Sequence, residues 1–74
     1  MRTPFKQWLD TMAKVIRAEM TLQKHSIEAV AKIIGIHHTT LSRKLKEPGR
    51  FTAGELGQLS ELLSIDPRNP QVKA

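Results

Sequence analysis

A glycine between two short apolar patterns constrains this chain more than any other feature. Before it, apolar residues recur every three or four positions, the spacing of one helix face: Ile27, Val30, Ala31 and Ile34. Gly35 then interrupts the pattern, and a glycine just past a helix end can adopt a positive φ without a Cβ clash. A second pattern begins at His38 and places two leucines one turn apart: Leu41 and Leu45. The stretch predicts helices at about 27–34 and 38–46, joined by a tight turn.

Two further helices are expected on either side of this pair. Thr3 and Pro4 suit the N-cap and the first position of a helix. One apolar face then continues over about four turns, with Phe5, Trp8, Leu9, Met12, Val15, Ile16 and Met20. Thr52 and Glu55 form a capping-box pattern before an inner face of Leu56, Leu59 and Leu63. These patterns predict helices at about 4–21 and 53–63, and the first is either one helix or two helices with a kink.

The length and the last residues predict the domain organisation. The chain has 74 residues, enough for one domain with one small core. The proline-rich sequence that begins at Asp66 cannot continue a helix. We therefore expect an all-α protein, a small four- to five-helix bundle, with one domain over residues 1–66 and a flexible tail over residues 67–74.

The charge distribution favours a polyanionic partner. The formal net charge is +5 and the isoelectric point is about 10.1. Four basic residues lie within eight positions, opposed only by Glu47: Arg43, Lys44, Lys46 and Arg50. A basic patch on one element is typical of nucleic-acid binding, and the alternative is a charged face that only keeps the protein in solution.

Composition also excludes several classes of function. The chain has no cysteine, and it carries no recognisable Ser-His-carboxylate set, glycine-rich phosphate loop or carboxylate cluster. His37 and His38 are adjacent, diverge on a helix and have no third ligand nearby, so no metal site is predicted. No apolar run approaches the roughly 18 residues of a membrane span, and no signal peptide is seen. We predict no enzymatic activity, no cofactor, no membrane association and a cytoplasmic location.

The central stretch resembles a known family of DNA-binding proteins. The pattern A-x-x-x-G-I-x-x-x-x-L-S-R, carried by Ala31, Gly35, Ile36, Leu41, Ser42 and Arg43, is similar to the helix-turn-helix of the phage Cro/repressor-type (XRE-like) family. The following KLKEPGRFTAGELGQLSELLSID resembles the next segment of that family, so the resemblance covers roughly residues 15–65. It implies a lambda-repressor-like fold whose second motif helix enters the DNA major groove. GIHHTTLSRKLK is also similar to the Fis-type motif, but the predicted helix at 53–63 argues against that family.

The resemblance also implies which residues touch DNA. Base-edge contacts are expected from His38, Thr39, Ser42 and Arg43. Arg43 is the preferred specific reader because arginine can pair with guanine O6 and N7 in a bidentate manner, and the alternative is a phosphate contact. His38 could make a pH-sensitive contact. Phosphate contacts are expected from Thr40, Lys44, Lys46, Arg50 and Thr52.

Two functions of different class follow. The first is a sequence-specific transcriptional regulator, a repressor of Cro kind. It would bind double-stranded DNA at a palindromic operator, as a dimer, in a bacterial or phage-infected cell. The second is a helix-turn-helix module that binds another regulatory protein, like an anti-repressor or antitoxin. The aromatic end of the first helix, with Phe5, Trp8 and Met12, is either part of the core or a dimer or partner surface.

Overall fold

The apolar stripe of the N-terminal segment folds as one uninterrupted helix. In the computed structural model, which describes residues 4–72, α1 runs over Pro4–Leu22. Its inward positions include Met12 and Ile16, which are both fully buried. A kink between two helices is therefore excluded. The predicted N-cap, Thr3, lies outside the described residues.

The other three helices begin and end where the sequence predicted. Helix α2 covers Ile27–Ile34, α3 covers His38–Lys46 and α4 covers Ala53–Leu63. Between α3 and α4 the chain forms a short 3-10 helix, η1, over Pro48–Arg50. Proline suits the first turn of a helix, because the backbone N–H that proline lacks would have no hydrogen-bond partner there. The protein is thus all-α, and residues 4–72 form no strand.

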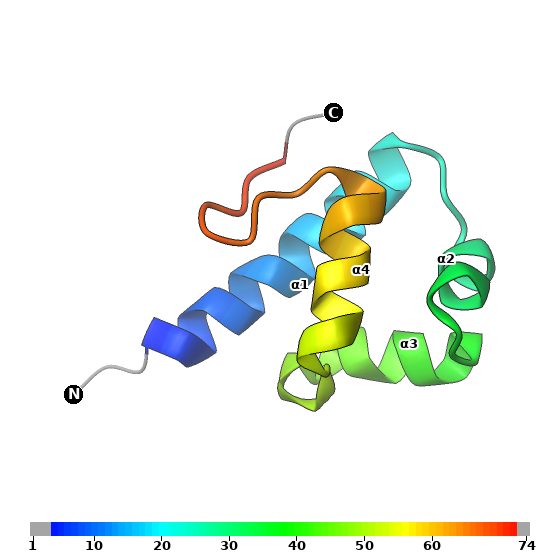
Figure 1. Cartoon of the computed structure of the whole chain (residues 1–74), viewed down its shortest axis with the longest axis horizontal. Helices are drawn as coiled ribbons and strands as arrows, with labels where there is room; N and C mark the ends of the chain where they lie inside the picture. Colours follow the sequence, from blue (N-terminus) through cyan, green and yellow to red (C-terminus); the bar gives the residue numbers. More distant parts are fainter. Residues whose placement is uncertain (1–3, 73–74) are drawn as a thin grey trace.

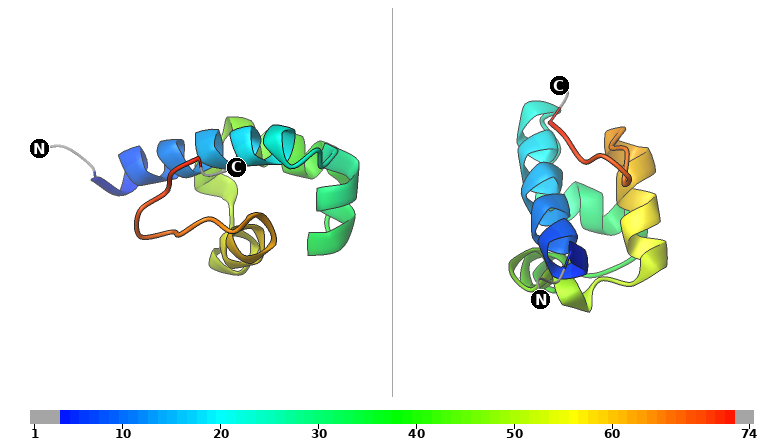
Figure 2. Two further views of the ribbon diagram at one scale, coloured as in Figure 1. Left: turned by 90° about the horizontal axis from the view of Figure 1, so that it is seen from above. Right: turned by 90° about the vertical axis from the view of Figure 1, so that its left-hand side faces the viewer.

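The helices enclose one core on the inner side of α1. Figure 1 shows α4 crossing α1, with α2 and α3 forming a pair at one end of the molecule. Figure 2 shows the same crossing from above, where α4 is seen end-on beside α1. Each of the four α-helices contributes to the core, whose buried members are Met12, Val15, Ile16, Met20, Val30, Ala31, Ile34, Leu41, Leu45, Phe51, Leu59, Leu63 and Ile65. Apolar burial of this kind is the main force that stabilises a small helical domain.

Residues after α4 return to α1 instead of leaving the bundle. Ser64 ends α4 in a left-handed conformation, and Ile65 is buried in the core. The indole Nε1 of Trp8 then donates a hydrogen bond to the carbonyl of Pro67, with an N···O distance of 2.5 Å. The tail predicted to be flexible therefore starts with a contact to α1, and residues 73–74 lie outside the described part of the chain.

Candidate nucleic-acid interface

The connection between α2 and α3 is closed by backbone geometry that needs glycine. The Ser26 hydroxyl caps α2 by accepting from the Ala29 amide at 3.1 Å. At the other end Gly35 has a φ of 81°, a left-handed conformation in which a side chain would be strained. The amide of Ile36 reaches back to the carbonyl of Ala31 at 2.9 Å. This pattern reverses the chain within three residues and fixes how α3 leaves α2.

Both ends of α3 are defined by side chains and charge. At the N-terminus the Nδ1 atom of His37 accepts a hydrogen bond from the Thr39 amide at 3.2 Å. At the C-terminus the Glu47 amide donates to the carbonyl of Arg43 at 2.9 Å. Three basic residues lie in the last turn, where the negative helix end stabilises cations: Arg43, Lys44 and Lys46.

The two sides of α3 differ sharply in exposure. Leu41 and Leu45 face the core and are buried, as predicted. Of the four residues expected to read bases, three are exposed: His38, Thr39 and Arg43. The fourth, Ser42, is half-buried and lines a groove together with Arg17 and His25. Three of the predicted readers are therefore open to solvent, and Ser42 is partly covered.

Lys44, one of the predicted phosphate contacts, forms an ion pair within the protein. Its Nζ lies 2.7 Å from both carboxylate oxygens of Glu55, and the two side chains are only 16% and 12% exposed. Burial raises the pKa of Glu55, but hydrogen bonds from Lys44 and Thr52 and the ammonium charge outweigh it, so this pKa lies below its usual value. Moving Lys44 to a phosphate would leave the Glu55 carboxylate without its counter-charge, so the predicted phosphate contact competes with this ion pair.

Thr52 is also largely engaged within the chain. Its amide donates to Glu55 Oε1 at 2.9 Å, and its hydroxyl accepts from the Glu55 amide at 3.1 Å. This reciprocal pair is the capping box predicted for α4, and it is confirmed. The amide is therefore not free for a phosphate, whereas the exposed hydroxyl keeps its own proton and can still donate.

The remaining predicted phosphate contacts have different surroundings. Arg50 forms an ion pair with Glu47, and both side chains are more than half exposed. Thr40 is half-buried and Lys46 is exposed. Among residues 4–72 neither Lys46 nor Arg43 has an ion-pair partner. These two cations are free to meet a ligand, whereas the charge of Arg50 is partly balanced.

Two basic residues of α1 lie beside the end of α3, although the sequence did not assign them to the interface. Lys14 and Arg17 are exposed and line one groove with Lys46, between α1 and the end of α3. Asp10 also lines this groove. The sequence showed that Lys14 and Arg17 share the polar face of α1, but only the packing of α1 against α3 sets them beside Lys46. The result is a basic surface, formed by Lys14, Arg17 and Lys46.

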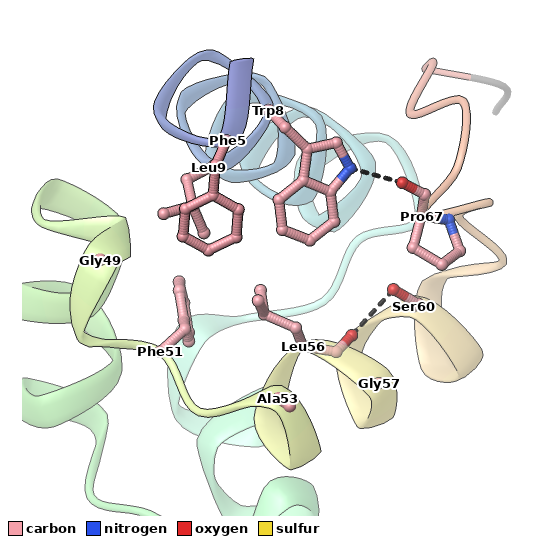
Figure 3. Close-up of a pocket in the computed structure, with 10 residues that line it drawn as sticks. All are labelled: Phe5, Trp8, Leu9, Gly49, Phe51, Ala53, Leu56, Gly57, Ser60 and Pro67. Atoms are coloured by element: carbon pink, nitrogen blue, oxygen red, sulfur yellow. Dashed lines mark hydrogen bonds between the residues drawn. The ribbon is translucent and has the colours of Figure 1, made fainter. Parts of the chain in front are cut away.

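A second, apolar groove lies at the N-terminal end of α1. Its volume is about 340 Å³, and it is lined by Phe5, Trp8, Leu9, Gly49, Phe51, Ala53, Leu56, Gly57, Ser60 and Pro67. Figure 3 shows the α1 side chains facing Phe51 and Leu56 across this groove. Its two polar side chains are already bonded, because Trp8 donates to Pro67 and the Ser60 hydroxyl donates to the carbonyl of Leu56 at 2.8 Å. The groove therefore offers apolar contacts.

The three residues proposed for a dimer or partner surface differ in solvent exposure. Phe5 is 69% exposed and stacks on Trp8, with ring centroids 5.9 Å apart. Trp8 is half-buried and packs against the core. Met12 is 0% exposed, which agrees with the core alternative for this residue. The stripe is core at Met12 and open at Phe5 because the helices facing α1 end before its first turn.

Residues 4–72 contain no group of three histidine, aspartate or glutamate side chains placed to hold a metal ion. None of the described helices is long and apolar enough to cross a membrane. Scans of the chain against protein-family models, curated proteins and solved structures give no match. The surfaces described above are therefore the basis for assigning a function.

Proposed function

We propose that this protein is a sequence-specific regulator that binds double-stranded DNA through a helix-turn-helix formed by α2 and α3. The observation that carries this proposal is the outer side of α3. It presents His38, Thr39 and Arg43 to solvent, and Arg43 has no ion-pair partner among residues 4–72. An exposed helix face with free hydrogen-bonding side chains suits the major groove, which is about 12 Å wide and admits one α-helix.

The basic surface supplies the contacts that position α3. Lys46 at the end of α3 shares a groove with Lys14 and Arg17 on α1. Cations in this place suit the phosphates that border the groove, which fix the register of a protein on the duplex. A single copy offers few contacts, so we propose a dimer on a palindromic operator with half-sites about one helical turn apart.

The test is a fluorescence-anisotropy titration with Arg43→Ala and Arg43→Lys. The probes are DNA from the upstream region of the gene and a scrambled duplex, each at two salt concentrations. We expect the wild type to prefer the native duplex. If Arg43 reads a guanine, both variants lose about 1–3 kcal/mol on that duplex, because lysine keeps the charge without the bidentate geometry.

Arg43→Lys separates base reading from phosphate binding. If Arg43 only holds a phosphate, Arg43→Lys binds both duplexes nearly as well as the wild type, and Arg43→Ala weakens both equally. Equal, weak and steeply salt-dependent binding of the wild type to both duplexes contradicts sequence-specific recognition, since such binding is the signature of a generic basic surface.

A second candidate function is a protein-interaction module. The apolar groove and the exposed ring of Phe5 favour it, because an apolar cleft beside an unpaired aromatic side chain is typical of protein contacts. Phe5→Ala is the suitable variant, since Phe5 is largely exposed and its loss leaves the core in place. Under this function Phe5→Ala abolishes binding to a regulatory protein and leaves DNA affinity unchanged; if it instead weakens cooperative DNA binding, the groove joins two copies of this chain.

A further inference from the structure

We propose that His37 is a positioning residue for the DNA-facing side of α3, and that it works only while its imidazole is neutral. The consequence for DNA rests on the proposed function. The effect on α3 itself is a property of the free protein. His37 is not one of the residues predicted to touch DNA, but it contacts two that are: His38 and Thr39.

One nitrogen of His37 holds the first turn of α3. Its Nδ1 atom lies 3.2 Å from the Thr39 amide nitrogen and 2.8 Å from the Thr39 hydroxyl. The imidazole ring also stacks on that of His38, with centroids 4.4 Å apart and an interplanar angle of 29°. A single side chain thus caps α3 and sets the orientation of the first two outward residues.

The cap requires a lone pair on Nδ1. A backbone amide can only donate, so Nδ1 must accept, and the ring proton must be on Nε2. If Nδ1 were also protonated, it would become a donor. Its N–H would then point at the N–H of Thr39, and the two cannot form a hydrogen bond. The Thr39 hydroxyl could still accept from the protonated ring, so His37 would stay near Thr39 while the amide loses its partner.

The part of the chain that the structure describes places no carboxylate in an ion pair with the His37 ring. The charged residues of the preceding helix, α2, are Glu28 in its first turn and Lys32 in its last, and neither bonds to His37. His37 therefore has no anion to retain it once it is charged.

Acidification is thus expected to loosen the N-terminal turn of α3. Histidine side chains change charge between about pH 5 and 8, and loss of an N-cap weakens a helix end. His38 and Thr39 would then lose their fixed orientation. The added positive charge favours any DNA equally, whereas the loosened turn affects only the sequence-specific contacts. The ratio of specific to non-specific affinity should therefore fall as pH falls.

The test measures amide exchange in the free protein, with two matched variants. His37→Ser replaces the imidazole by a cap that does not titrate in this range, and His38→Gln removes the neighbouring imidazole but keeps His37. In the wild type, protection of the Thr39 and Leu41 amides, corrected for intrinsic exchange, should fall about fivefold between about pH 7.5 and pH 5.5. His37→Ser should keep the same protection at both pH values, and His38→Gln should still show the fall.

Two results would overturn the proposal: unchanged protection in the wild type, or an equal fall in His37→Ser. The second arm compares anisotropy titrations on native and scrambled duplexes at the same two pH values. We expect the specificity ratio to fall in the wild type and to stay constant in His37→Ser. If no duplex is preferred at any pH, the DNA-binding function fails, while the exchange measurement still decides the role of His37.

Discussion

Lys44 and Glu55 connect α3 to α4 through the least exposed ion pair of residues 4–72. The pair is 2.7 Å long, and Glu55 also completes the capping box of α4 through Thr52. Its carboxylate therefore serves two elements at once. An ion pair in this position holds the angle between α3 and the rest of the bundle, although its desolvation offsets part of the electrostatic gain.

Glu55→Gln should destabilise the fold at neutral pH. Glutamine can still accept from the Thr52 amide, so the cap is kept, but Lys44 is left largely buried without its counter-charge. We expect a loss of about 1–3 kcal/mol in the free energy of unfolding, measured by urea denaturation. Glu47→Gln is the matched control, because its pair with Arg50 is exposed and such pairs contribute about 0–1 kcal/mol.

The same contact sets a pH dependence whose sign follows from Glu55. Its pKa is lower in the folded protein than in the unfolded chain, so the stabilisation is present above the unfolded pKa and is lost as pH falls through the folded pKa. Urea midpoints of the wild type and Glu55→Gln should thus converge in acid. A constant difference down to the lowest pH at which both fold would contradict this assignment.

At the scale of elements, replacing either of two glycines by alanine should change the stability of the protein in opposite directions. Gly57 lies inside α4 and Gly35 ends α2, and a Cβ at either position meets nothing within 4 Å. Only Gly35 has a positive φ. Gly57→Ala should stabilise the protein by about 0.5–1 kcal/mol because alanine has the higher helix propensity. Gly35→Ala should destabilise it by about 1–2 kcal/mol because the left-handed conformation is strained.

Thermal unfolding of both variants, monitored by circular dichroism, checks this pair. The comparison isolates backbone conformation, since neither methyl group has a neighbour to clash with. Destabilisation by Gly57→Ala would show that α4 has a different backbone conformation there from the one described. If Gly35→Ala has no effect, the turn between α2 and α3 is not closed by a left-handed residue.

At the scale of the whole molecule, the basic surface should determine how DNA affinity depends on salt. Lys14 and Arg17 are exposed on α1 and share a groove with Lys46. If each neutralises one phosphate, the double variant Lys14→Gln with Arg17→Gln should reduce the slope of log K against log salt by about two. Arg68→Gln is the control, since Arg68 follows α4, is 93% exposed and pairs with Asp66.

The slopes come from anisotropy titrations of a scrambled duplex, which report only sequence-independent contacts. An unchanged slope in the double variant would mean that the DNA does not reach α1 and that phosphate contacts are confined to α3 and its neighbours. A slope reduced equally by Arg68→Gln would show a general effect of net charge rather than a located surface.

Local signals in the sequence determined the elements of this protein. The ends of the helices follow from Gly35, from the capping box at Thr52 and Glu55 and from apolar positions spaced three or four apart, all of which act within a few residues of the chain. The side of α3 that faces the core followed in the same way from Leu41 and Leu45. His37 was the weakest of these signals, because its imidazole takes a capping role in which serine or threonine is more common.

Tertiary structure alone decided which side chains are available for function. Lys44 and Lys46 look alike in the sequence, but packing sets Lys44 against a carboxylate eleven residues away and leaves Lys46 open. Met12 and Phe5 share one apolar stripe, yet the stripe is longer than the core that it meets. Contacts of this kind join residues distant in the chain, so their energies depend on how helices pack and cannot be read from spacing along one helix.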